Sequence, residues 1–188
     1  MPGTAPRPLR ADAQRNRDRL VAVAVRAFAT AGPAGSEVTL DAVAKEAGVG
    51  IGTLYRHFPT REALIEAAYR NELDRLCDAA PELLAAGPPE QALRDWMDRC
   101  LDYMTTKHGM ADALNTVIAC GGNPFAHSRE RLRGAMTLLM EAGARAGAVR
   151  ADVPPTEVLL GINGVSLAAG GPDQRELAGR LLDLLMDG

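Results

Sequence analysis

Cysteine pairs, long apolar runs and strand-like alternation are all missing from this sequence of 188 residues. The three cysteines, Cys77, Cys100 and Cys120, form no C-x-x-C pair and have no histidine at ligand spacing, so we expect no metal and no cofactor. No apolar run approaches the ~20 residues that span a bilayer. The basic N-terminus lacks the apolar stretch of a signal peptide, so we expect a cytoplasmic chain with no membrane partner.

An odd number of cysteines in such a chain is typical of small buried apolar side chains, and a redox-sensing thiol is the alternative. Hydrophobic residues make up 47% and charged residues 24%, a balance that favours a folded chain with a buried core. The net charge is −3, yet residues 1–70 carry ten basic and seven acidic side chains, and residues 71–188 carry eleven and seventeen. This asymmetry is expected when one end of a protein binds phosphate.

The apolar residues recur at helical spacing along the whole chain, and β-branched residues are sparse. Glycine and proline separate the helical segments, and Gly87-Pro88-Pro89, with Pro81 before it, indicates a linker into the second half. The sequence therefore predicts an all-α protein with about nine helices. The expected helices cover residues 12–31, 40–47, 50–57, 61–79, 90–106, 109–120, 125–146 and 155–169, followed by a last one around 177–185.

Residues 39–58 have the pattern of two short helices joined by a tight turn. Thr39 is a good N-cap for the first helix, and Asp41 in its first turn suits the helix dipole. Gly48 supplies the left-handed residue that ends this helix, and the second helix begins at once. Such a helix-turn-helix places its second helix in the major groove of DNA. We therefore expect DNA to be a partner.

The stretch T-L-Y-R-H-F-P-T-R-E-A-L, residues 53–64, closely resembles the DNA-binding region of the TetR family of repressors, and the resemblance covers about residues 12–70. It implies that three positions face bases, that four bind phosphates, and that Arg56 does either. The base-facing positions are Ile51, Gly52 and Tyr55, and the phosphate-binding ones are Thr39, Thr53, His57 and Arg61. Because Gly50 and Gly52 offer no side chains, DNA shape is an alternative source of specificity at these positions.

Two further features of this half have competing interpretations. Arg7, Arg10, Arg15 and Arg17 either reach a minor groove or flanking phosphates, or belong to a solubilising tail. His57 resembles a catalytic base, but no serine or cysteine nucleophile motif lies nearby. We therefore expect the chain not to be an enzyme, and a small helical enzyme is the least favoured alternative.

The resemblance implies that the remainder of the chain is a helical domain that binds an effector and dimerises. Soft and adaptable side chains suit an irregular ligand pocket, whereas plain core packing is the alternative for each of them. The candidate ligand-binding residues are Trp96, Met97, Cys100, Met104, Asn115, Phe125, Met136 and Met140.

Dimerisation is expected along the last two helices. The segment 155–169 is apolar on most sides, and Gly161 and Gly164 permit the close approach of another helix. Pairing both helices with their two-fold mates produces a four-helix bundle. The expected interface residues are Leu159, Ile162, Val165, Leu177, Leu181 and Leu184.

The pattern and the resemblance together predict three regions. Residues 1–60 form an N-terminal arm and a three-helix DNA-binding domain, 61–80 a connecting helix, and 81–188 the effector-binding and dimerisation domain. The expected protein is a homodimeric regulator, a repressor that a small-molecule ligand releases from a palindromic operator on double-stranded DNA. A regulator of the same fold without an inducer is the alternative, and activation in place of repression is left open.

Overall fold

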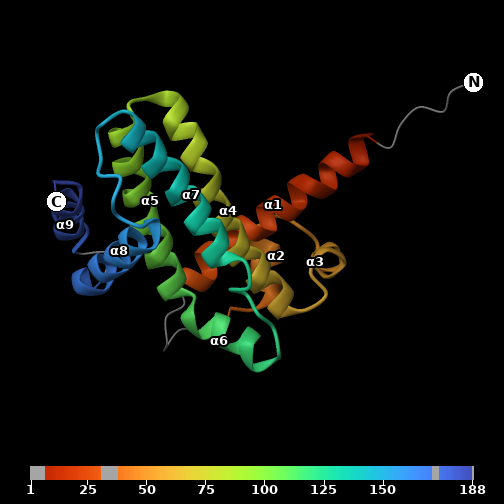
Figure 1. Cartoon of the computed structure of the whole chain (residues 1–188). Helices are drawn as coiled ribbons and strands as arrows, with labels where there is room; N and C mark the ends of the chain where they lie inside the picture. Colours follow the sequence, from red (N-terminus) through yellow and green to blue (C-terminus); the bar gives the residue numbers. More distant parts are fainter. Residues whose placement is uncertain (1–6, 31–37, 171–173, 188) are drawn as a thin grey trace, which may run out of the picture. The chain divides into compact units, whose positions relative to one another are not determined.

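The computed structural model describes residues 7–30, 38–170 and 174–187 and, for residues 7–10, the backbone alone. Within these ranges the chain forms nine α-helices and no strands (Figure 1), as the sequence predicts. None of these helices is long and apolar enough to cross a membrane. The helices are α1 (Arg7–Thr30), α2 (Leu40–Glu46), α3 (Ile51–His57), α4 (Arg61–Ala86), α5 (Pro89–Gly109), α6 (Ala111–Ala119), α7 (Ser128–Arg145), α8 (Pro155–Ala169) and α9 (Arg175–Asp187).

The chain divides into two compact units. Unit 1 comprises Met1–Asn71 and Gly109–Pro124, and unit 2 comprises Glu72–His108 and Phe125–Gly188. These units differ from the boundaries expected from the sequence, since α6 is grouped with the N-terminal helices and α4 contributes residues to both units. Sequence spacing does not reveal such a grouping, because it depends on contacts between segments far apart in the chain.

In unit 1, α1, α2 and α3 pack against one another. Their apolar faces are buried at Leu20 and Phe28 of α1, Val43 of α2 and Leu54 of α3, with Phe58 directly after α3. Full burial of one such side chain stabilises a fold by about 1.5–3 kcal/mol. The packing therefore compensates for the shortness of α2 and α3, which have seven residues each.

The turn between α2 and α3 has the predicted local chemistry. The Thr39 hydroxyl accepts the backbone N–H of Ala42 at 3.2 Å, which confirms Thr39 as the N-cap of α2. Gly48 has a φ of +63°, the left-handed conformation expected of it, and the Val49 N–H then donates to the Ala44 carbonyl at 2.9 Å. This short turn sets where α3 begins relative to α2.

The expected end of α4 near Ala79 is wrong, because Pro81 lies inside the helix, which continues to Ala86. A proline in a helix interior costs about 3 kcal/mol because it removes one hydrogen bond and crowds the preceding turn. Pro81 is exposed, whereas Ala79 and Ala80 beside it are buried in unit 2. We attribute the continuation to this packing, which moves the break to Gly87 and Pro88.

Unit 2 is built around Trp96 of α5, which is fully buried and donates its indole N–H to the Leu76 carbonyl of α4 at 2.8 Å. Farther along, α8 packs against α7 and α9. Charged side chains attach α9 to α5. Arg94 of α5 lies 2.6 Å from Asp183 of α9, and Arg175 of α9 lies 2.8 Å from Asp98 of α5.

Gly109, the last residue of α5, lies against α1 within unit 1. A Cβ atom added to Gly109 would stand 2.2 Å from the Ala29 carbonyl oxygen, which is backbone and has little freedom to move. We expect Gly109→Ala to lower the free energy of unfolding by about 1–3 kcal/mol, the usual cost of overpacking.

The matched control is Gly134→Ala in α7, where the new methyl group meets nothing within 4 Å. There alanine should stabilise the helix by about 0.5–1 kcal/mol. Urea denaturation of both variants measures the difference. Equal stability of the two would mean that the contact between Gly109 and Ala29 is not close in solution.

Candidate functional site

The exposed side of α3 carries the residues expected to face bases. Leu54 is fully buried, while Tyr55 is 50% exposed and Ile51 is 37% exposed. Gly52 is also exposed, and a Cβ atom there would meet nothing within 4 Å. The helix therefore presents one aromatic hydroxyl, one apolar side chain and a stretch of bare backbone to an incoming partner.

Two residues of α3 interact along their own helix. Arg56 donates from Nε to the Gly52 carbonyl at 3.3 Å and from Nη2 to the Thr53 hydroxyl at 3.3 Å. These bonds keep the guanidinium close to the helix surface, next to Thr53. The pair thus forms a preassembled group of donors that suits a phosphate oxygen.

Thr39 and His57 flank this surface. Thr39 is exposed, and its oxygen accepts the capping bond, so its hydroxyl hydrogen is available to donate to a phosphate. His57 is half-buried at the end of α3, with its ring centroid 6.2 Å from that of Phe58. Both residues lie at the ends of helix-turn-helix elements, where phosphate contacts commonly occur.

Arg61, expected to bind a phosphate, also holds unit 1 together. Its guanidinium carbon lies 5.1 Å from the centroid of the Phe28 ring of α1, and its Nε donates to the Val38 carbonyl at 3.4 Å. The side chain therefore ties the start of α4 to α1 and to the segment before α2. Sequence reasoning missed this structural role because Phe28 and Val38 are distant from Arg61 in the chain.

Arg17 contacts the same region from α1. Its guanidinium carbon lies 5.5 Å from the Phe58 ring, an arrangement that favours a cation–π interaction. Arg15 pairs with Asp12 on the surface of α1. The side chains of Arg7 and Arg10, which the sequence also suggested for DNA contact, lie outside the described residues.

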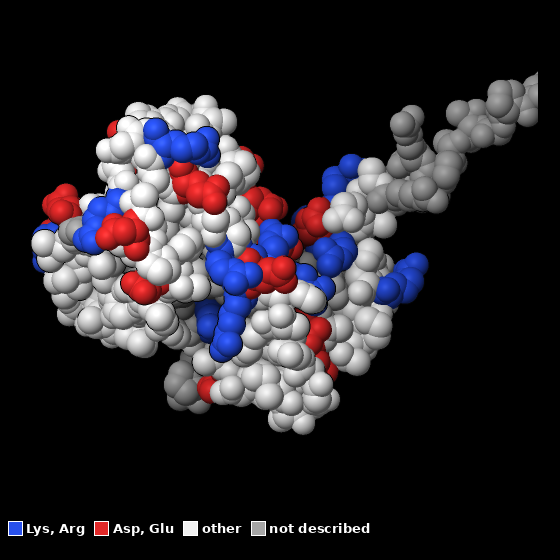
Figure 2. All heavy atoms as spheres, viewed as in Figure 1, with Lys and Arg blue, Asp and Glu red and all other residues white. Residues whose placement is uncertain are grey.

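The distribution of charged side chains does not by itself identify the candidate DNA-binding site. On the face drawn in Figure 2, Lys and Arg side chains are interspersed with Asp and Glu, with basic groups near α1 and α3 of unit 1. Any binding to DNA must therefore use individually placed donors on these helices in addition to the general attraction of a basic surface.

Several of the expected ligand-binding residues belong to the core of unit 2. Trp96, Met97, Cys100 and Met136 are almost completely buried in unit 2. Burial raises the pKa of the Cys100 thiol to about 12. A thiol in this state is unreactive, as expected for a small apolar core side chain.

The other expected ligand residues are more accessible. Met104 is half-buried, and Phe125 lies beneath the Lys107 ammonium group at 5.0 Å from the ring centroid. Asn115 is exposed on α6, in unit 1, and so is separated from the others by the division of the chain. Cys120 is exposed as well, which differs from the buried position expected of the cysteines.

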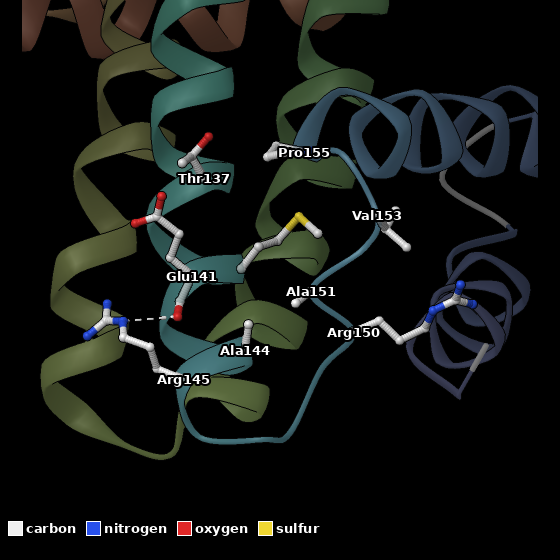
Figure 3. A pocket seen from close by; sticks show the side chains of 9 residues that line it. Thr137, Glu141, Ala144, Arg145, Arg150, Ala151, Val153 and Pro155 are labelled. Atoms are coloured by element: carbon white, nitrogen blue, oxygen red, sulfur yellow. Dashed lines mark hydrogen bonds between the residues drawn. The ribbon is translucent and has the colours of Figure 1, made fainter.

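A pocket of about 550 Å³ lies where α7 ends and α8 begins (Figure 3). Its wall combines apolar groups with the charged groups Glu141, Arg145 and Arg150, and the Arg145 Nε donates to the Glu141 carbonyl at 3.1 Å. Of the expected ligand residues, Met140 lines it. The sequence did not indicate the other members, because the loop after α7 must fold back to bring them together. The lining residues are Thr137, Met140, Glu141, Ala144, Arg145, Arg150, Ala151, Val153 and Pro155.

The expected dimer residues do not form one exposed face. Ile162 and Val165 are buried within the chain, on the side of α8 that packs against its neighbours. Leu159, Leu177 and Leu181 are half-buried, and Leu184 is 66% exposed. The other large exposed side chains of α8 and α9 are Leu160, Leu167 and Leu185.

The members of this set on α8 lie on a helix with little charge, whereas α9 carries five charged side chains. Glu157 is the one charged residue in α8, and Figure 2 shows an almost uncharged area over this helix. Among the described residues, no group of three or more His, Cys, Asp or Glu side chains is placed to hold a metal ion.

Two family models match the chain. Residues 20–68 match the family described as bacterial regulatory proteins, tetR family, and residues 88–188 match the C-terminal domain of SbtR-like transcriptional regulators. An HTH-type transcriptional regulator of Staphylococcus aureus is 36% identical over 66 residues. The chain covers only 35% of the length of that relative.

Two solved structures resemble the whole chain. The TetR transcriptional regulator SCO0520 of Streptomyces coelicolor is 53% identical, with a TM-score of 0.85, over 92% of this chain and 97% of that one. A TetR transcription regulatory protein of Mycobacterium vanbaalenii is 34% identical, with a TM-score of 0.78, over 96% and 98% of the two chains.

Variants of Arg56 and Arg61 distinguish a structural role of the side chain from the mere loss of a positive charge. We expect Arg61→Ala to lower the free energy of unfolding by about 1–2 kcal/mol, because it removes the contact with Phe28 and the bond to Val38. Arg56→Ala removes the same charge but only contacts within α3, and should change stability by less than about 0.5 kcal/mol. Urea denaturation distinguishes them, and equal effects would exclude a structural role for Arg61.

Proposed function

The chain belongs to the TetR family of transcriptional regulators, and we propose that it is a homodimeric repressor that leaves a pseudo-palindromic operator when a small molecule binds unit 2. The helix-turn-helix makes it a DNA-binding regulator and not an enzyme. Because it acts on chromosomal DNA, we place it in the cytoplasm. The exposed face of α3, with Tyr55 at its centre, carries the proposal.

In the proposed complex α3 lies in the major groove. Ile51, Gly52 and Tyr55 face the bases, because they are exposed on the side opposite Leu54. Thr39, Thr53, Arg56, His57 and Arg61 supply hydroxyl, imidazole and guanidinium donors for phosphates around this face. Since the helix offers few base-reading side chains, sequence-dependent DNA shape contributes to the choice of operator.

Dimerisation through α8 and α9 explains their exposed leucines. Leu160, Leu167, Leu184 and Leu185 are large apolar side chains that a monomer would leave in water, at a cost of about 25 cal/mol for each Å². Gly164 has open space around it, so a partner helix can approach α8 closely there. A four-helix bundle of two α8 and two α9 helices would place two α3 helices about one DNA turn apart, ~34–36 Å, or somewhat more.

Among the pockets that the described residues form, we propose the one between α7 and α8 as the effector site. Its volume of about 550 Å³ suits a small organic molecule. Glu141 and Arg145 in its wall carry opposite charges, and Arg150 is paired with Asp152 at 2.8 Å, so the wall favours a ligand with polar groups and not one sign of charge. Of the residues expected from the sequence, Met140 would contact a ligand bound there.

Release from DNA requires that the effector favour a state in which the two α3 helices are wrongly spaced. Coupling of this kind amounts to ~1–3 kcal/mol and is reciprocal, so DNA weakens effector binding by the same factor. We propose α4 as the connecting element, because it begins at Arg61 and runs on into the residues of unit 2. A regulator without an inducer is the alternative, and it differs in that no small molecule changes its affinity for DNA.

Selection of operator sequences from random duplex DNA tests the proposal. Wild-type protein should enrich a palindromic sequence, with affinity that falls steeply as salt rises. Ile51→Ala/Tyr55→Ala should bind this sequence at least about tenfold more weakly, because each lost base contact costs ~1–3 kcal/mol. Ile118→Ala, which removes an equally exposed side chain from α6, is the control and should bind as wild type. Without enrichment, or with equal binding by all three proteins, α3 would not be the DNA-binding helix.

The oligomeric state tests the α8–α9 interface. We expect Leu160→Glu to convert the dimer to monomer at micromolar concentration, because an unpaired carboxylate would be buried between the two copies. Leu138→Glu in α7 places the same charge at another exposed leucine and should leave the dimer intact. Sedimentation velocity measures both. A Leu160→Glu variant that stays dimeric would place the interface elsewhere.

A further inference from the structure

The N-terminal part of α1 extends beyond the packed core of unit 1. Residues 11–19 are exposed apart from the half-buried Asn16, and burial begins at Leu20. The family match also begins at residue 20. Figure 1 shows α1 continuing past α2 and α3 before it reaches its N-terminal end. We call residues 7–19 the α1 extension.

The chemistry of the α1 extension favours a polyanionic partner. Between residues 11 and 19 the only apolar side chains are Ala11 and Ala13, so this segment has little apolar surface to bury against a protein. The whole extension contains five arginines and two aspartates. Arg15 pairs with Asp12, but both remain more than half exposed, so water or a stronger anion can replace this contact easily.

One contact places the extension beside the helix proposed to bind DNA. The guanidinium of Arg17 lies over the ring of Phe58, the residue that ends α3, and Phe58 follows the proposed phosphate ligand His57. The extension therefore leaves the core of unit 1 at the edge of the proposed phosphate-binding residues. A positive charge in this position lies next to DNA whenever α3 occupies the groove.

We propose that the α1 extension binds backbone phosphates of the duplex that flanks each operator half-site. This inference rests on the proposed binding of an operator by α3. From Arg17 to Arg7 a helix rises about 15 Å, which corresponds to four or five base pairs of duplex. Contacts with phosphates do not depend on base sequence, so they lengthen the site without adding to the consensus that selection reveals.

Two duplexes and three variants test this inference. One duplex contains only the selected operator, and the other carries about six additional base pairs on each side. Arg15→Gln/Arg17→Gln/Arg19→Gln removes the three described charges, and Arg15→Gln/Arg19→Gln keeps the contact of Arg17 with Phe58. Arg99→Gln/Arg129→Gln/Arg133→Gln removes three exposed charges from unit 2 and is the matched control.

Wild type and the control should bind the longer duplex more tightly, with a steeper dependence on salt. Two additional phosphate contacts per dimer steepen the salt slope by about 1.8, so the advantage of the longer duplex should shrink about tenfold between 50 and 200 mM salt. The triple variant of the extension should lose this advantage, and the double variant should lose most of it. Both should bind the short duplex as wild type does.

Other outcomes would overturn the inference. If wild type binds both duplexes with equal affinity and equal salt slope, the extension does not touch DNA. If the advantage depends on A·T-rich flanks, the arginines enter a minor groove and do not bind phosphates. If only the triple variant loses binding to the short duplex, the loss of Arg17 has damaged α3 through Phe58, and the double variant then decides the inference by keeping or losing the advantage of the longer duplex. Failure of wild type to bind either duplex would refute operator binding itself, and the inference with it.

Discussion

The buried position of Leu54 is the constraint on which the DNA-binding surface depends. A helix of seven residues is not stable by itself, and α3 exists because Leu54, with Phe58 after it, is buried among the helices of unit 1. With these two side chains turned inward, the helical period turns Ile51 and Tyr55 outward. The Arg61 side chain reinforces this arrangement by joining the start of α4 to Phe28. The stability of unit 1 and the proposed recognition of DNA therefore depend on the same short helix.

A related constraint governs α8, which is apolar on almost every side. One side, with Ile162 and Val165, is buried within the chain, so the opposite leucines have no cover in a single copy. Arg94 and Arg175 fix α9 to α5 through Asp183, Asp98 and Asp102, which limits the freedom of α9 beside α8. The exposed leucines of this helix pair are therefore the apolar surface that the proposed interface between copies would bury.

Much of unit 1 was predictable because its signals are local. The N-cap at Thr39 and the left-handed Gly48 act on their immediate neighbours, so the sequence located the helix-turn-helix correctly. Predictions failed where distant segments decide the outcome. Pro81 suggested the end of a helix that packing continues to Ala86. Local propensity carries no information about which neighbour covers a side chain.

By itself the sequence determined that the protein is all-helical, where most helices begin and end, and where the helix-turn-helix lies, because helical periodicity and capping act over a few residues. Only the tertiary structure decided that α6 belongs with the N-terminal helices, that Trp96 and Cys100 are core, and which leucines of α8 remain exposed. Each of these outcomes depends on contacts between residues far apart in the chain. The free energy of such contacts is the sum of many small packing contributions. The periodicity of a single helix does not show which of these contacts form.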